Sequence, residues 1–240
     1  MKTLNFSKRN LKELLRDPTT VIFTLILPVA LLFLMSIINK NVPIPVFAIE
    51  RLTPGIAFFG LSFVGLFAAI NVSADRETAF ISRLFSTTMK PANYILGYTC
   101  PLVLIGTLQA MICFAVSIIF GMKFSFSMIF ALIICAVCSL LFISIGICLG
   151  CVLTNKASSG ISSIIIQLAA WLSGIWFDVE LVGKVYKKIC EFLPFYHGVE
   201  IIKATLNLDC QDFFAHFVWI IGYTVILFAL AIFLFRKKMT

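Results

Sequence analysis

The sequence is short of charge. Only 12% of its 240 residues are Asp, Glu, Lys or Arg, about half of the roughly 25% that is typical of soluble domains. Hydrophobic residues make up 61%, and phenylalanine alone occurs 25 times. Apolar runs of about 20 residues, the length that crosses a bilayer as a helix, recur along the chain and leave no room for a sizeable soluble domain. The composition therefore predicts an all-α polytopic membrane protein.

Motifs for enzymatic chemistry are missing as well. The sequence has no G-x-x-x-x-G-K-[ST] pattern, so it does not cradle nucleotide phosphates in that way. It has no Ser–His pair at membrane depth and no His-x-x-x-His or Glu-x-x-x-His pattern, and neither His197 nor His216 lies near a carboxylate–cysteine cluster. We therefore predict no catalytic residue and no metal site. A secondary transporter or channel remains the alternative, although it usually needs buried ionisable residues for coupling and the spans hold almost none.

Eight cysteines do not point to a metal site either. Two C-x-x-C pairs begin at Cys135 and Cys148 on one predicted helix, about 20 Å apart at 1.5 Å per residue. That separation is too long for one tetrahedral site, so these cysteines are predicted to be small buried hydrophobes. Cys190 and Cys210 are expected outside the membrane, where they either form a disulfide or remain free.

Six membrane spans are predicted, near residues 20–38, 55–72, 98–120, 128–153, 160–177 and 214–235. Six spans place both termini on one side. Twelve Lys and Arg fall in the termini and the loops after spans two and four, against seven in the other loops. The positive-inside rule then predicts a multi-pass protein with both termini in the cytoplasm.

Two segments flank this bundle. Residues 4–17 form a basic amphipathic stretch, predicted to lie in the membrane interface. Its leucines share one face of a helix, and its cations Lys8, Arg9, Lys12 and Arg16 decorate the rest. Residues 178–212 are predicted to be an extracellular, partly re-entrant segment of two short helices. Within it, Glu200 and Lys203 are expected to reach outer water or to pair with each other.

The longest polar interruption of the N-terminal half runs from Ser73 to Gly97, and residues 74–90 are its predicted cytoplasmic loop. If Asp75 caps a helix there, Glu77 lies near the positive end of the helix dipole, where a carboxylate is favoured. The helix would carry an apolar ridge of Phe80, Ile81, Leu84 and Phe85, flanked by Arg76 and Arg83. Such a ridge either rests on lipid or docks into a groove on a soluble partner.

Polar residues inside the spans are few. They either line a cavity at a dimer interface or form interhelical hydrogen bonds. The main ones are Asn71, Thr107, Gln109 and Gln167.

The loop segment DRETAFISRLFSTTMKPANYILG resembles the first cytoplasmic loop of ABC-2 type transporter permeases. A second stretch resembles the family's signature at the end of span five and before span six, through Ser173, Gly174, Phe177, Leu193, Pro194 and Tyr196. Asp178 and Gly183 depart from it, because the family commonly has proline at these positions. The two motifs, in this order and spacing, extend the resemblance to essentially the whole chain as a single domain, residues 1–240.

The resemblance implies a function. Such permeases pair with a separate ATP-binding subunit, which holds the ATP and Mg, while the permease itself binds no cofactor. The residues from Asp75 to Phe85 would transmit the closure of that subunit to the spans, and the second motif would form an outer gate. A second copy, or a paired permease, would complete the membrane domain, with lipid around it and no nucleic acid. The cargo would be a drug, peptide antibiotic or lipid-linked molecule exported across a bacterial cell membrane, as in multidrug or antibiotic resistance.

Overall fold

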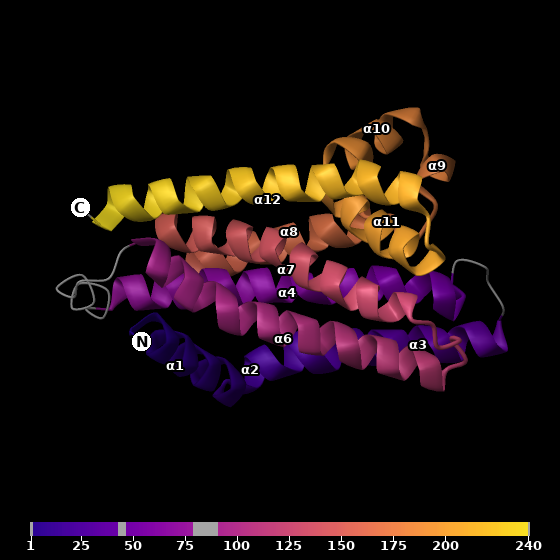
Figure 1. Cartoon of the computed structure of the whole chain (residues 1–240), viewed down its shortest axis with the longest axis horizontal. Coiled ribbons are helices and arrows are strands. Elements are labelled where there is room, and N and C mark those ends of the chain that lie inside the picture. Colours follow the sequence, from indigo (N-terminus) through magenta and orange to yellow (C-terminus); the bar gives the residue numbers. More distant parts are fainter. Residues whose placement is uncertain (1, 43–46, 79–90, 240) are drawn as a thin grey trace.

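The computed structural model describes residues 2–42, 47–78 and 91–239. These residues are helical and contain no strand, as the composition predicts. The long helices run side by side along one axis, with the N- and C-termini near the same end and the short helices α9–α11 at the other (Figure 1).

The N-terminal quarter consists of α1 (Lys2–Arg16), α2 (Pro18–Val21), the π-helical turn η1 (Ile22–Ile26) and α3 (Leu27–Asn41). The chain bends at Asp17, whose carboxylate accepts hydrogen bonds from the backbone N–H groups of Thr19 and Thr20 while Pro18 takes the first helical position. This is an N-cap of the favoured kind.

The π-turn accommodates a proline. The N–H of Leu27 bonds the carbonyl of Ile22, five residues back, directly before Pro28, which has no N–H to donate and whose ring would crowd a regular turn. The helix therefore continues through the proline without a break, and Pro18–Asn41 forms one candidate span.

The remaining helices are α4 (Ile49–Glu77), α6 (Pro91–Ile119), α7 (Ser127–Val152), α8 (Asn155–Leu172), α9 (Val179–Val182), α10 (Lys184–Phe192), α11 (Pro194–Asn207) and α12 (Cys210–Met239). Five helices of the described chain are long and apolar enough to span a membrane: Pro18–Asn41, Ile49–Glu77, Ala92–Ile119, Ser127–Val152 and Cys210–Lys237. The predicted fifth span corresponds to α8, which has 18 residues and a polar N-terminal half.

Helix α4 is the centre of the bundle. In its most apolar 18-residue window 83% of residues are buried, against 17% in α12. Its tightest contact is with α7, where a Cβ atom added to Gly146 would lie 2.1 Å from the carbonyl oxygen of Gly65, and one on Gly150 would lie 2.8 Å from that of Ala69. Small residues four apart on both helices thus let the backbones touch, as in other membrane helix pairs.

The outer segment has three short helices where two were predicted. Gly183, at φ +133°, separates α9 from α10, and α11 begins at Pro194. The ammonium of Lys203 lies 2.7 Å from the carboxylate of Glu200, which confirms the expected pairing. Cys190 and Cys210 are both free thiols, the first buried and the second exposed, so the disulfide alternative is wrong for this structure.

Candidate coupling site

The last turn of α4 carries Asp75, Arg76 and Glu77. The prediction that Asp75 starts a new helix is wrong, because α4 continues unbroken to Glu77. The N–H of Thr78 bonds the carbonyl of Ala74 and closes this turn. Consecutive residues of an α-helix point about 100° apart, so three in a row can reach three different neighbours.

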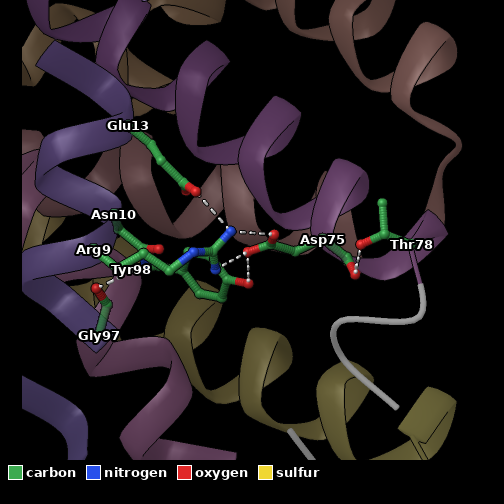
Figure 2. Close-up of polar contacts among 7 residues, drawn as sticks. All are labelled: Arg9, Asn10, Glu13, Asp75, Thr78, Gly97 and Tyr98. Carbon is green, nitrogen blue, oxygen red and sulfur yellow. Dashed lines mark hydrogen bonds and ion pairs between the residues drawn. The ribbon is translucent and has the colours of Figure 1, made fainter. Parts of the chain in front are cut away.

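Asp75 joins α4 to α1 and α6. Its carboxylate accepts a hydrogen bond of 2.7 Å from the hydroxyl of Tyr98 and two, of 3.2 and 3.4 Å, from the guanidinium of Arg9. Arg9 also pairs with Glu13 at 2.8 Å, so its guanidinium lies between two carboxylates (Figure 2). Burial opposes the charge on Arg9, but the hydrogen bonds and charges of Asp75 and Glu13 outweigh it and raise the pKa of Arg9.

Helix α1 is consequently docked on the bundle. Phe6 packs edge-on against the rings of Tyr94 and Tyr98, and the side-chain amide of Asn10 donates to the carbonyl of Gly97 at 3.2 Å. A Cβ atom on Gly97 would lie 2.3 Å from the ring of Phe6, so this approach needs glycine. The prediction placed Arg9 on the exposed cationic face, and it instead points inward. The other three predicted cations of this helix are exposed: Lys8, Lys12 and Arg16.

Arg76 holds the C-terminal end of α7. Its guanidinium donates to the carbonyl of Cys151 at 2.6 Å and also to the carbonyl of Leu153. The last carbonyls of a helix have no partner within the helix, and a cation there also complements the helix dipole. Arg76 therefore satisfies the end of α7 by contact and by charge.

Glu77 holds the beginning of α8. Its carboxylate accepts a hydrogen bond of 2.8 Å from the backbone N–H of Asn155, the first residue of that helix. The predicted position of Glu77 in the first turn of a helix capped by Asp75 is therefore wrong: Glu77 ends α4, and its carboxylate approaches the positive end of α8 instead. Arg76 and Glu77 thus hydrogen-bond the two ends of the short α7–α8 connection.

These three side chains connect the end of α4 to α1, α6, α7 and α8. The rest of the predicted coupling ridge, Phe80, Ile81, Arg83, Leu84 and Phe85, lies outside the described residues. The described part of the site is thus the junction from which that segment departs.

A groove of about 560 Å³ lies between the first span, α4 and α8. Four phenylalanines form much of its wall: Phe23, Phe59, Phe63 and Phe67. Its polar groups are Thr19, Ser159, Ser163 and Gln167, three of which come from α8. The volume falls within the range of small-molecule sites.

Of the predicted cavity-lining residues, Gln167 lines this groove. Gln109 is fully buried, and a Cβ atom on Gly60 would lie 2.2 Å from its amide nitrogen, so it packs between α4 and α6 instead. Thr107 bonds the carbonyl of Val103 in its own helix at 2.8 Å. Asn71 is half-buried on α4 and is not among the residues that line the groove.

The predicted outer-gate residues gather beyond the C-terminal end of α8. Ser173 is buried, Gly174 turns the chain at φ +72° and Phe177 contacts the rings of Trp171 and Tyr186. Pro194 is the first residue of α11, and a Cβ atom on Gly174 would lie 3.8 Å from the ring of Tyr196.

The two departures from the family pattern have structural roles. Asp178 forms an ion pair with Arg51 of α4, which a proline could not do. Gly183 has φ +133°, far from the φ of about −65° to which proline is restricted.

One contact of the outer end escaped sequence analysis. The Nδ1 atoms of His197 on α11 and His216 on α12 lie 2.7 Å apart. They are nineteen residues apart in sequence, and only the return of α12 along α11 brings them together.

The ABC-2 type transporter family model matches residues 2–207, from α1 to the end of α11. The chain belongs to this family. A comparison with curated proteins gives no match. The family and the apolar helices together make the protein a multi-pass permease subunit of an ABC transporter.

Proposed function

We propose that this permease works with a separate ATP-binding subunit and a second permease copy to export hydrophobic or amphipathic molecules. The observation that carries the proposal is the junction at the end of α4, where Asp75, Arg76 and Glu77 fasten four other helices. The chain has no P-loop of its own, so ATP and Mg would belong to the partner.

The junction supports coupling because of where it lies. The segment that resembles the family's coupling loop begins directly after it. A displacement of that segment would act on α4, and the charged contacts would carry it to α1, α6, α7 and α8 together. Contacts to charged groups are about twice as strong as neutral hydrogen bonds, so the four helix ends would move as one body.

The arrangement of helices supports a six-span topology. At 1.5 Å per residue the 18 residues of α8 extend about 27 Å, close to the roughly 30 Å of a hydrocarbon core. Both termini lie near one end of the bundle (Figure 1), as an even number of crossings requires. The excess of Lys and Arg supports a cytoplasmic position for that end, and the proposed location is a bacterial cell membrane.

The phenylalanine-walled groove is the proposed half-site for cargo. Its polar groups are hydroxyls and one amide, and none of the described residues that line it is charged. The same helix, α8, exposes Ile164, Leu168 and Trp171, an apolar surface that a second permease copy would cover. Such a lining fits a molecule with a large apolar surface and few hydrogen-bonding groups, such as a drug, a peptide antibiotic or a lipid-linked molecule.

The test is to isolate the permease from its host membrane in a mild detergent, identify its partners and reconstitute the complex. We expect an ATP-binding subunit, two permease copies and transport that requires ATP. A chain that is isolated alone and transports on a proton gradient would contradict the proposal and favour a secondary transporter.

A further inference from the structure

The outer end of the bundle is held by a pair of histidines. His197 is buried, and its Nε2 lies 2.7 Å from the backbone carbonyl of Glu191 on α10. Its Nδ1 lies 2.7 Å from Nδ1 of His216 on α12. The indole of Trp219 stacks on the ring of His197, with centroids 4.9 Å apart and an angle of 7° between the planes. One imidazole therefore links α10, α11 and α12.

These contacts fix the protons of the pair. A carbonyl oxygen only accepts, so Nε2 of His197 carries a hydrogen and donates it to Glu191. In a neutral imidazole the other nitrogen is then bare, so Nδ1 of His197 accepts from Nδ1–H of His216. Nε2 of His216 is left without a hydrogen, and it is the one nitrogen of the pair that can take a proton without breaking either contact.

A first added proton thus goes to His216 and leaves the link between α11 and α12 in place. A second proton has only Nδ1 of His197 to bind. It would place two N–H donors and two positive charges against each other across 2.7 Å. The contact cannot survive that state, because neither nitrogen has a lone pair to accept with.

We propose that the His197–His216 pair is an acid-sensitive latch, which keeps α10, α11 and α12 together until His197 is protonated and then releases them. That the latch faces the outside rests on the proposed topology. The latch itself rests on the geometry of the pair alone.

The charged and titratable groups around the pair agree with this sequence of steps. Acidic groups near it are Glu191 on α10, Glu200 on α11 and Asp212 on α12. Tyr196 contacts both rings. These carboxylates compensate one added charge, but Glu200 is already paired with Lys203 and Glu191 lies near Lys187.

The other helices packed on α11 present uncharged groups to it, including the hydroxyl of Ser127 on α7, which donates to the carbonyl of Leu206. Phe58 of α4 faces Gly198, Phe142 of α7 stacks on Phe195, and Gly174 beyond the end of α8 faces Tyr196. Arg51 at the outer end of α4 is engaged by Asp178. Among the described residues these groups offer no further carboxylate to compensate a second charge.

The direction of the pH effect follows. Burial lowers the pKa of His197, the hydrogen bond to the carbonyl of Glu191 opposes this, and the charge of His216 lowers it further. The fold therefore favours neutral His197. Its contribution to stability is fully present above the ordinary pKa of about 6.5 and is lost as the pH falls through the lowered pKa.

Trp219 offers a direct readout. The chain has three tryptophans, so the full-length permease in lipid nanodiscs, labelled with fluorotryptophan, should give three ¹⁹F signals. Loss of one signal in Trp219→Phe assigns it, and the other two serve as internal controls. We expect the Trp219 signal to show a step below about pH 6.5 that reports the second proton, on His197, and this step should disappear in His197→Gln.

His216→Phe is the sharper variant. It keeps a ring on α12 but removes both the hydrogen-bond donor and the second charge, so His197 takes its proton more readily. The midpoint of the Trp219 step should rise by about one pH unit. A Trp219 signal that is flat between pH 7.5 and 4.5, a step that persists in His197→Gln, or an unchanged midpoint in His216→Phe would each overturn the proposal.

Release is measured separately at Cys190. This thiol is buried on α10, whereas Cys210 is exposed. With a disulfide reagent that reacts in acid, and with mass spectrometry of the labelled peptides, the labelling of Cys190 relative to Cys210 should increase several-fold across the same step. Constant relative labelling would show that His197 titrates without opening and would overturn the latch.

Discussion

The two ends of the bundle are held together by different chemistry. At the end that bears the termini, charged side chains connect the helices: Arg76 donates to carbonyls at the end of α7, Glu77 accepts from the first N–H of α8, and Arg9 pairs with Asp75. At the other end, a pair of imidazoles and an exposed ion pair hold short helices. The difference between the two ends lies in the imidazole pair, because histidine is the side chain whose ordinary pKa falls between pH 5 and 8. We interpret the first end as one that transmits motion between helices, and the second as one whose helix contacts are broken in acid.

Both ends depend on the close contact between α4 and α7, where Gly65 and Ala69 face Gly146 and Gly150. Disrupting this contact, the α4–α7 seam, should have the largest effect. The Cβ atom of a valine at Gly146 would lie 2.1 Å from the carbonyl oxygen of Gly65, far inside van der Waals contact. We expect Gly146→Val to destabilise the fold by about 3 kcal/mol or more and to reduce the amount of protein in the membrane. Gly222→Val is the matched control, because a Cβ there meets nothing within 4 Å. Equal abundance of the two variants would contradict the account of the seam.

The contribution of Asp75 should be the next largest. Asp75→Ala leaves the partly buried guanidinium of Arg9 without its strongest partner, and we expect a loss of about 1–3 kcal/mol. Arg9→Ala in the same background should add little. A double-mutant cycle, measured by denaturant unfolding in detergent, should therefore give a coupling of about 1–2 kcal/mol. Additive losses would show that the two side chains do not act together.

The outer ion pair should contribute least. The side chains of Arg51 and Asp178 are 33% and 45% exposed, so solvent screens them and the pair is worth about 0–1 kcal/mol. We expect Asp178→Asn to change the unfolding free energy by less than 1 kcal/mol and the change to shrink in 0.5 M salt. A salt-independent loss as large as that of Asp75→Ala would remove the contrast between the two ends.

The sequence was informative where a pattern is local. Apolar runs predicted the helical membrane protein, and the long apolar helices of the structure confirm it. The motif resemblance led to the family that the family model confirms. Local spacing also found the Glu200–Lys203 pair, since three residues bring side chains together on any helix.

The sequence was misleading where the outcome depends on which helices meet. Arg9 has the pattern of a surface cation, yet the carboxylate of Asp75, 66 residues away, turns it inward. Gln109 reads as a cavity residue until Gly60 provides a hollow that it fills. The two histidines carry no local signal, because a pair nineteen residues apart on two antiparallel helices has no periodicity to detect.

The central claim is that the last turn of α4 couples the membrane helices to the ATP-binding subunit. The most direct test is the number of molecules transported per ATP hydrolysed by the reconstituted complex with Glu77→Ala. Thr78→Ala is the control, because within the described residues the Thr78 hydroxyl bonds only the carbonyl of Asp75 in its own helix. We predict that Glu77→Ala lowers the ratio several-fold at unchanged abundance while Thr78→Ala leaves it near wild type. A wild-type ratio in Glu77→Ala would contradict the claim.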